Sequence, residues 1–371
     1  VYYEDEHKID EIVNNLPDCV KVIDVNKKKI TSNPPKLYKL STLQGEQSIH
    51  GLTADDVLKT VQGLYEKGYL SYPRTDCEFV SADEDFDSLI NVAGSIAGYE
   101  DAAQTARNNK HSVLAKKEYV NDKEIQNHGH TALIPTIKKP DMTNLTNDEA
   151  MIYRMIAKRF LAIFQPPLIQ EQTTVVSEAG DYYVKTTGKV TIQKGYTEFL
   201  GINICDADVK TVKIGDVYNI ESVRKLEKTT TCPKRFTDGT LITLMENPAK
   251  YLIDATIKKG IDKLTIGTSA TRAAIINKLV DDRYIERKKG SLVPTNFGSY
   301  MVHAIRGISM CQIDTTGQWE QMFKKVRNGS VSYDCAEIYF SAQLKELLQD
   351  IKGINKVYYG DAKDKKFATI M

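Results

Sequence analysis

Residues 64–76 read LYEKGYLSYPRTD, and this stretch joins the end of a helix to a segment that cannot be helical. Upstream of it, apolar residues recur at helical spacing, which predicts a helix over residues 53–68. Gly68 can end that helix in the left-handed conformation. Because a proline disfavours the helical region for the residue before it, Pro73 keeps Tyr72 extended. The sequence therefore predicts a tyrosine presented on stiff, extended backbone shortly after a helix.

The residue types around Tyr72 suit chemistry on a phosphodiester. A tyrosine has a pKa of about 10 and is a weak nucleophile at neutral pH unless a neighbour stabilises its phenolate. Arg74 stands two residues further on, and on an extended segment the two side chains project from one face. A guanidinium can both stabilise a phenolate and hold a phosphate through two parallel hydrogen bonds. The same spacing also fits a turn with an exposed tyrosine and an Arg–Asp pair, so the residues alone leave both interpretations open.

The composition is ordinary for a globular chain and excludes several classes of protein. With 371 residues, 41% hydrophobic and 27% charged, the chain should form about two or three domains rather than a disordered state. A net charge of +1 excludes a simple basic nucleic-acid coat protein but permits a local basic channel. No apolar run is long enough to cross a membrane. The six cysteines form no Cys-x-x-Cys pair, which disfavours a disulfide framework and a cysteine zinc site and favours a reducing compartment.

The order of the predicted elements indicates an α+β multidomain chain. Residues 20–31 have the pattern of a strand pair around a polar turn, and residues 170–227 that of hairpins and further strands. Helical patterns fill the part between them and the part after them, so we predict a helical domain inserted into a β domain. The first residue is Val1 and no signal-peptide pattern follows, so we expect an excised fragment. The predicted ranges are 1–45 for the first part of the β domain, 46–167 for the helical domain that carries the tyrosine, 168–232 for the second part of the β domain, and 233–371 for a helical base domain.

Three helices outside the first have clear signals. Residues 147–164 follow a Thr-x-x-Glu capping pattern and end at a Pro-Pro pair. Residues 270–281 form a helix that precedes a basic hairpin turning at Lys289–Gly290, an order typical of a winged helix. Residues 336–351 have the pattern of a closing amphipathic helix.

Several segments, in order along the chain, resemble the motifs of one family. The string LYEKGYLSYPRTD looks like the active-site region of type IA DNA topoisomerases, most closely the bacterial topoisomerase III branch. The resemblance runs from about Pro34 to about Leu348. The other segments that carry it are NPPKLYKLSTLQ (33–44), GHTALIPT (129–136), RMIAKRFLAIFQPP (154–167), KRFTDGTLITLMENPAKY (234–251), IGTSATRAAIINKL (266–279), YIERKKGSLVPTNFG (284–298) and DTTGQWEQMF (314–323).

The resemblance implies roles for individual residues. Tyr72 aligns with the nucleophile that forms a 5′-phosphotyrosine link to DNA, and Arg74 with the arginine that positions the scissile phosphate. His130 aligns with the family's active-site histidine, which contacts the phosphate region. In the topoisomerase I form, arginine and proline stand where this chain has Thr268 and Ser269. The DNA-binding residues implied in the same way are Gln62, Asp76, Thr268, Thr271 and Arg272, of which Asp76 also ends the tyrosine motif and should hold it in place.

The family resemblance also implies a fold, a cofactor and partners. The fold implied is a toroid in which a two-part β domain arches from a helical base and carries the tyrosine domain. Mg²⁺ in the family lies in an N-terminal Toprim domain, which supplies a glutamate and an Asp-x-Asp pair; this chain starts too late to contain it, so we expect it to bind no metal. The implied partners are single-stranded DNA and the protein's own Toprim domain, with no membrane, and we expect a cytoplasmic, nucleoid-associated monomer that needs no ATP.

Three local patterns resemble metal sites but are weak ones. In His128-Gly129-His130 the central residue is neither bulky nor apolar and no third ligand follows, so only His130 keeps a role, the one implied by the family. The pair Asp85 and Asp87 lies in a polar helical stretch. Residues 206–208 carry a second Asp-x-Asp string, which we interpret as the tip of a hairpin.

Two competing functions are weighed against a topoisomerase. A winged-helix module that binds single-stranded DNA without catalysis would show no covalent DNA–tyrosine adduct. The second competitor is a tyrosine recombinase or relaxase. A recombinase would place its tyrosine near the C-terminus after an Arg and a His-x-x-Arg motif, whereas in this chain Tyr72 precedes His130 and no His-x-x-Arg motif occurs. We therefore predict a type IA topoisomerase fragment that holds the nucleophile and is inactive alone because it has half of the active site.

Overall fold

The computed structural model describes residues 6–209, 211–248 and 264–354 of the chain. Contacts between residues divide the chain into two compact units, each made of three segments of the chain. One of the boundaries lies between Gly63 and Leu64. Unit 1 comprises Val1–Tyr38, Leu64–Tyr72 and Cys77–Pro233, and unit 2 comprises Lys39–Gly63, Pro73–Asp76 and Lys234–Met371.

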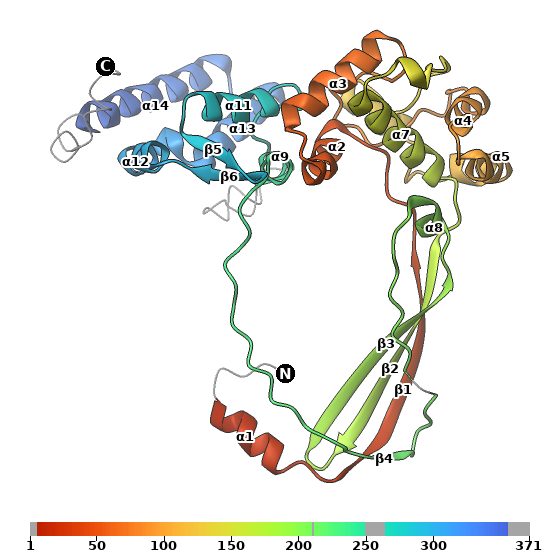
Figure 1. The fold of residues 1–371 in the computed structure, drawn as a ribbon. Helices are drawn as coiled ribbons and strands as arrows, with labels where there is room; N and C mark the ends of the chain where they lie inside the picture. The colour runs from red at the N-terminus through yellow and green to blue at the C-terminus, as the bar shows by residue number, and fades with distance from the viewer. Residues whose placement is uncertain (1–5, 210, 249–263, 355–371) are drawn as a thin grey trace. The chain divides into compact units, whose positions relative to one another are not determined.

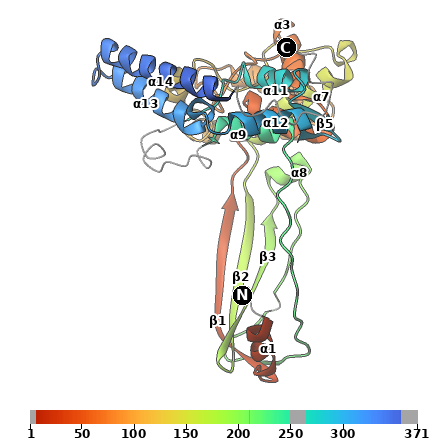
Figure 2. The same cartoon turned by 90° about the vertical axis from the view of Figure 1, so that its left-hand side faces the viewer.

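A long antiparallel sheet forms one part of unit 1 (Figures 1 and 2). Its strands lie in the order β3-β2-β1-β4. Residues 33–167 lie between the paired strands β1 and β2, which confirms the predicted insertion of helices into a β domain. The strands are β1 (Cys19–Ser32), β2 (Leu168–Ala179), β3 (Tyr182–Gln193) and β4 (Val217–Asn219).

The first strand differs from its prediction. Residues 20–31 were expected to form two strands around a polar turn, but β1 is one strand that pairs with β2 from Lys21 to Ser32. The polar residues in its centre stay extended because β2 satisfies their backbone groups along the whole length. One bulge, between Val22 and Asp24, interrupts the register.

The region after β3 holds less sheet than the sequence pattern predicted. Of the strands expected between β3 and residue 227, the described residues form β4 alone, and residues 220–236 lie mostly exposed without regular structure. The expected hairpin tip at 206–208 is also wrong. Instead, Ala207 pairs with Lys189 of β3, and the Asp206 carboxylate accepts hydrogen bonds from the backbone N–H and the hydroxyl of Thr191 at 3.0 and 2.7 Å.

Helices α4, α5 and α7 of unit 1 pack on one another around a core of large side chains that includes Phe160, Phe164 and Tyr153. The phenyl rings of Phe86 and Phe164 meet edge to face at 6.2 Å and join α4 to the end of α7. The predicted cap of α7 is present: Thr146 and Glu149 form a reciprocal capping box. The helices are α1 (Glu6–Asn14), α4 (Phe86–Gly94), α5 (Glu100–Leu114), α6 (Asp122–His128), α7 (Asn147–Ala162) and α8 (Tyr196–Leu200), with a 3-10 turn at Met142–Asn144.

Unit 2 is built where α2 (Leu40–Gln47) packs on α9 (Asp238–Glu246). The two helices approach so closely that a Cβ on Gly239 would lie 2.5 Å from the Cα of Gly45, so α9 could not carry a larger residue at this position. This packing places residues 39–63 with the C-terminal part of the chain, so the two compact units cut across the predicted range 46–167.

A helix and a hairpin complete the core of unit 2, as predicted from the winged-helix pattern. The hairpin turns at Lys289 and Gly290, which both have a positive φ, the geometry of a tight two-residue hairpin turn. Ala273 and Ile276 of the helix and Leu292 of the hairpin share one cluster with Ile242 of α9. The elements are α3 (Ala54–Glu66, most of it in this unit), α11 (Arg272–Asp281), β5 (Ile285–Lys288) and β6 (Ser291–Pro294).

Helices close the described part of unit 2. The amphipathic helix predicted at 336–351 is α14, which is longer at both ends. Among the described residues, none of the helices is long and apolar enough to cross a membrane. The elements are α12 (Asn296–Ile305), α13 (Ile313–Arg327) and α14 (Tyr333–Ile354), with 3-10 turns at Ser48–His50 and Ser309–Cys311.

Candidate active site

In unit 1, the segment that leads to Tyr72 pairs with a second segment about sixty residues later in the chain. Residues 68–71 run antiparallel to residues 132–136. Ser71 makes most of the link: its N–H donates to the Ile134 carbonyl at 3.0 Å, and its hydroxyl donates to the Ala132 carbonyl at 2.8 Å. The same hydroxyl accepts the N–H of Ile134 at 2.9 Å. This pairing sets the position of Tyr72 relative to the residues just before Ala132.

One of those residues is His130, and its imidazole stacks on the phenol of Tyr72. The ring centroids lie 4.2 Å apart with an angle of 31° between the planes. Tyr65, from the last turn of α3, meets the Tyr72 ring edge to face, with the two ring centroids 5.6 Å apart. Tyr72 is half-buried and His130 is exposed. Within the part of the chain that the structure describes, no protein group hydrogen-bonds the Tyr72 hydroxyl, so that oxygen is available to an outside partner.

The two histidines of the His-x-His string have separate surroundings. Gly129 ends α6 with φ 79°, and His128 lies 4.0 Å from Glu124 on the same helix. His130 leaves the helix and reaches Tyr72. The structure therefore pairs His130 with the tyrosine rather than with His128.

The turn before Tyr72 is fixed to helix α7. Gly68 ends α3 with φ 77°, as predicted, and the ammonium of the preceding Lys67 lies 2.6 Å from a carboxylate oxygen of Glu149. Burial alone would raise the pKa of Glu149, but the hydrogen bond and charge of Lys67 and the N–H of Thr146 outweigh it and hold that pKa below its usual value. Lys138 also donates to the Lys67 carbonyl at 2.8 Å. Glu149 therefore serves two purposes: it caps α7 and holds the turn that carries the tyrosine.

Pro73 to Asp76 belong to unit 2, and in this segment the backbone differs from the prediction. The backbone bends at Pro73 and Arg74, where a straight extended segment was predicted. The reason is that the following carbonyls are held elsewhere. The Ser269 hydroxyl donates to the Arg74 carbonyl at 3.3 Å, and the N–H of Leu40 donates to the Thr75 carbonyl at 3.1 Å. The Arg74 side chain is exposed and has no ion-pair partner among the described residues.

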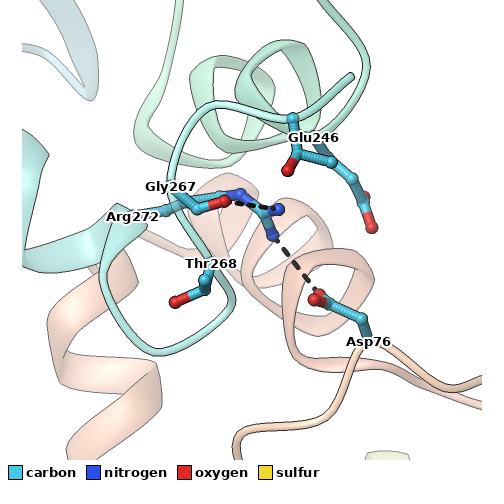
Figure 3. Close-up of a pocket in the computed structure, with 6 residues that line it drawn as sticks. Asp76, Glu246, Gly267, Thr268 and Arg272 are labelled. Atoms are coloured by element: carbon cyan, nitrogen blue, oxygen red, sulfur yellow. Dashed lines mark hydrogen bonds and ion pairs between the residues drawn. The ribbon is translucent and has the colours of Figure 1, made fainter. Parts of the chain in front are cut away.

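Unit 2 also contains a polar cavity of about 210 Å³ beside this segment (Figure 3). Arg272, which is 2% exposed, crosses it: its guanidinium donates to the carbonyls of Ile266 and Gly267 at 3.2 and 3.3 Å. The same guanidinium lies 3.3 Å from the carboxylate of Asp76. The lining residues are Asp76, Glu246, Thr265, Gly267, Thr268 and Arg272.

A second ion pair lies at the wall of this cavity. The Lys39 ammonium is 2.6 Å from one oxygen of Glu246, and the Ser41 hydroxyl donates to the other at 2.9 Å. Burial alone would raise the pKa of Glu246, but the bond and charge of Lys39 and the bond from Ser41 outweigh it, so this pKa lies below its usual value. The charge of Arg272 acts in the same direction.

The residues predicted to bind DNA are in unit 2 but in different surroundings. Thr268 and Thr271 are exposed at the start of α11, where the Thr268 N–H donates to the Thr271 hydroxyl at 2.8 Å. Gln62 is half-buried on α3. Asp76 and Arg272 are brought together, and Arg272 is turned inward.

Sequence reasoning missed Lys39, Ser41 and Glu246 in unit 2, and Ser71 and Glu149 as supports of the tyrosine in unit 1. One signal was available for Glu246: it ends an otherwise apolar stretch, LITLMEN, where an acid must find a partner.

The described residues supply no metal ligand set. Nowhere in residues 6–209, 211–248 and 264–354 do three or more His, Cys, Asp or Glu side chains gather as they would around a metal ion. Of the Asp-x-Asp strings, Asp85 caps α4 by accepting the N–H of Ser88, and Asp206 bonds Thr191.

Comparison with known proteins gives one consistent result. A sequence profile of the family described as DNA topoisomerase matches residues 2–336. The chain is 30% identical to DNA topoisomerase 3 of Bacillus anthracis over 374 residues, which cover 96% of this chain and 50% of the relative. It is 30% identical to DNA topoisomerase 3 of Bacillus licheniformis over 355 residues, covering 92% of this chain and 48% of that one. The chain thus spans about half the length of the curated relatives it matches.

A solved structure shares the fold. Full-length topoisomerase I from Thermotoga maritima matches with a TM-score of 0.62 at 23% sequence identity, covering 95% of this chain and 55% of that one. This likeness agrees with the fold expected from the sequence, and the chain itself is an α+β chain with helices inserted into a β domain.

Proposed function

This chain belongs to the type IA DNA topoisomerase family, and from that premise we propose that it supplies the tyrosine half of an enzyme that cleaves, passes and rejoins single DNA strands. The observation that carries the proposal is the surroundings of Tyr72. Its hydroxyl has no intramolecular partner in the described chain, its ring is held by His130 and Tyr65, and its backbone is fixed through Ser71. A nucleophile needs this combination of an available oxygen and a fixed position.

The proposed reaction is a transesterification. The Tyr72 oxygen attacks phosphorus, the bond from phosphorus to the 3′ oxygen of the upstream nucleotide breaks, and the phenolic proton is released. The products are a 5′-phosphotyrosine and a free 3′ hydroxyl. Attack by that hydroxyl reverses each change and reseals the strand. Because one phosphodiester bond replaces another, the cycle needs no ATP.

His130 and Arg74 are proposed to act on the phosphate. An imidazole 4.2 Å from the phenol, centroid to centroid, lies beside any phosphate that the Tyr72 oxygen attacks, and its N–H groups can donate to it. Arg74 is two residues from Tyr72, so their Cα atoms are at most about 7 Å apart whatever the local backbone. An exposed guanidinium at that reach can hold the phosphate through two hydrogen bonds. Gln62, Thr268 and Thr271 are proposed to contact the strand further along.

The other half of the enzyme is proposed to be a Toprim domain that binds Mg²⁺. Its support is the resemblance to the family and the length of the relatives, which is about twice that of this chain. The described residues of this chain do not form a metal site, so the proposed roles of Tyr72, Arg74 and His130 do not include metal binding.

A covalent adduct tests the proposal. The complete protein is mixed with a 3′-labelled single-stranded oligonucleotide, quenched with denaturant and run on a denaturing gel. We expect labelled protein, its loss in Tyr72→Phe, and its retention in the matched variant Tyr65→Phe, which keeps an aromatic ring at 5.6 Å. Strand binding by the unmutated protein with no adduct would overturn the proposal and favour a binding module without catalysis.

A further inference from the structure

Arg272 has surroundings that are unusual for a DNA-contacting arginine. Among the described residues it is the largest side chain that is fully buried, although arginine is almost never buried without partners. Its Nε and Nη2 atoms donate to the carbonyls of Ile266 and Gly267, and its Nη1 donates to Asp76. These bonds use three of the five guanidinium N–H groups, and because the side chain is 2% exposed, a phosphate would have to enter the cavity to reach the other two.

The partners of Arg272 link it to the tyrosine motif. Asp76 is the last residue of the motif, and its carboxylate is 27% exposed. Its ion pair with the buried Arg272 therefore anchors the end of the motif to the interior of unit 2. The bonds of Ser269 to the Arg74 carbonyl and of Leu40 to the Thr75 carbonyl hold the two residues before it. Each of these three consecutive residues is thus held by a contact within unit 2, and the contact at Asp76 is between charged groups.

The backbone of the loop before α11 supplies acceptors for the Arg272 guanidinium. Gly267 has φ 66°, a conformation that turns its carbonyl toward the guanidinium, and a Cβ there would lie 3.1 Å from the Thr271 hydroxyl oxygen. On the far side of the cavity, Glu246 is already neutralised by Lys39. Positive and negative groups therefore alternate in the order Lys39, Glu246, Arg272, Asp76, and Arg272 stands between the two acids (Figure 3).

We propose that Arg272 is a positioning residue for Arg74: it holds Asp76, and through Asp76 it fixes the backbone from which the Arg74 side chain reaches the phosphate. This inference rests on the proposed function of Arg74 and changes the role that the family resemblance gave to Arg272, from a strand contact to an internal support. The planar fork is required because its three donor atoms meet three acceptors in different directions, which a lysine ammonium cannot do from one point.

The test uses four variants: Arg272→Gln, Arg272→Lys, Asp76→Asn and the double variant Arg272→Gln with Asp76→Asn. Arg287→Gln is the matched control, because Arg287 also forms a largely buried pair in unit 2, with Asp238 at 2.6 Å, and its hydrogen bonds among the described residues go to Asp238 and Asn277 rather than to the tyrosine motif. Trp319 fluorescence, the only tryptophan signal, confirms that unit 2 is folded in each variant.

The first measurement is independent of catalysis. Hydrogen exchange of the 371-residue chain follows the Leu40 amide, whose bond to the Thr75 carbonyl reports whether the motif is held. We expect exchange about tenfold faster in Arg272→Gln and Asp76→Asn and unchanged in Arg287→Gln. Unchanged exchange in Arg272→Gln would overturn the inference, and so would an equal rise in the control, which would mean a general loss of stability.

The second measurement separates positioning from strand contact. In the complete protein, adduct formation should slow by about tenfold or more in Arg272→Gln, with little rescue by Arg272→Lys, and the double variant should be no worse than the worse single one. The Kd for a single-stranded oligonucleotide should stay within about twofold, and its salt dependence should not change. A higher Kd, together with a salt dependence that indicates about one phosphate contact fewer, would show that Arg272 binds a phosphate and would overturn the proposal. If the unmutated protein forms no adduct, the proposed function fails, while the exchange measurement still decides whether Arg272 holds the motif.

Discussion

Replacing Glu149 should loosen the turn that carries the tyrosine and destabilise unit 1. In Glu149→Ala, two interactions disappear: the capping bond to the Thr146 N–H at 3.0 Å and the ion pair with Lys67 at 2.6 Å. A helix cap contributes about 1 kcal/mol. A hydrogen bond to a charged group contributes about 1.5–3 kcal/mol when buried, and we take about 1 kcal/mol because the Lys67 side chain is 44% exposed. The expected loss is therefore about 2 kcal/mol in the free energy of unfolding.

Glu149→Gln separates the two interactions. A glutamine keeps an oxygen for the Thr146 N–H and loses the charge, so we expect a loss of about 1 kcal/mol. Glu171→Gln is the control, because Glu171 pairs with Lys27 at 3.1 Å while both side chains are well exposed. An exposed pair of this kind contributes about 0–1 kcal/mol, so that substitution should be close to neutral.

The direction of the pKa shift of Glu149 predicts how the free energy of unfolding depends on pH. The pKa of Glu149 in the folded chain lies below its usual value, so its stabilisation is fully present above the unfolded pKa of about 4.3 and is lost as the pH falls through the folded pKa. The difference between the unmutated chain and Glu149→Gln should therefore be constant from pH 7 down to about pH 5 and shrink below that.

Urea unfolding, monitored by far-ultraviolet circular dichroism, measures the loss in the free energy of unfolding. Hydrogen exchange of the amides of Lys67–Tyr69 shows where in the chain the loss occurs. Trp319 lies in unit 2 and should report little change. Equal stability of Glu149→Ala and Glu171→Gln, or unchanged exchange at Lys67–Tyr69, would refute the reasoning that one carboxylate both caps α7 and holds the turn.

Three further predictions concern Gly267, Ser71 and the activity of the chain by itself. Gly267→Ala should destabilise unit 2 by about 1–2 kcal/mol, because φ 66° is strained for alanine; urea unfolding followed by Trp319 fluorescence checks it, and an unchanged midpoint would contradict it. Ser71→Ala should leave the Ile134 N–H without its acceptor and lower the free energy of unfolding by about 1–2 kcal/mol. Urea unfolding measures this change, and a loss near zero would contradict the prediction. The 371-residue chain alone should not relax supercoiled DNA with or without Mg²⁺, and relaxation that disappears in Tyr72→Phe would show that it holds a complete active site.

Local structure followed from local sequence. The helix end at Gly68, the cap of α7 and the hairpin turn at Lys289–Gly290 each depend on a few neighbouring residues whose backbone preferences are strong. The family was predicted because several segments, in order along the chain, resemble the motifs of type IA DNA topoisomerases.

Features that depend on distant partners could not be predicted. Residues 20–31 form one strand because β2, about 150 residues later, bonds the polar middle that looked like a turn. The stacking of His130 on Tyr72 depends on hydrogen bonds between two segments far apart in sequence, and the burial of Arg272 depends on Asp76. No short-range pattern encodes such contacts, because Asp76, the charged partner of Arg272, lies in another motif.

The central claim is that the Tyr72 oxygen becomes covalently bound to DNA. The most direct measurement traps the adduct of the complete protein with a single-stranded oligonucleotide, digests both components and identifies the modified peptide by mass spectrometry. We predict one nucleotide joined through its 5′ phosphate to Tyr72, in a peptide that also contains Arg74. A nucleotide on Tyr65, Tyr69 or any other residue, or a link through a 3′ phosphate, would contradict the claim.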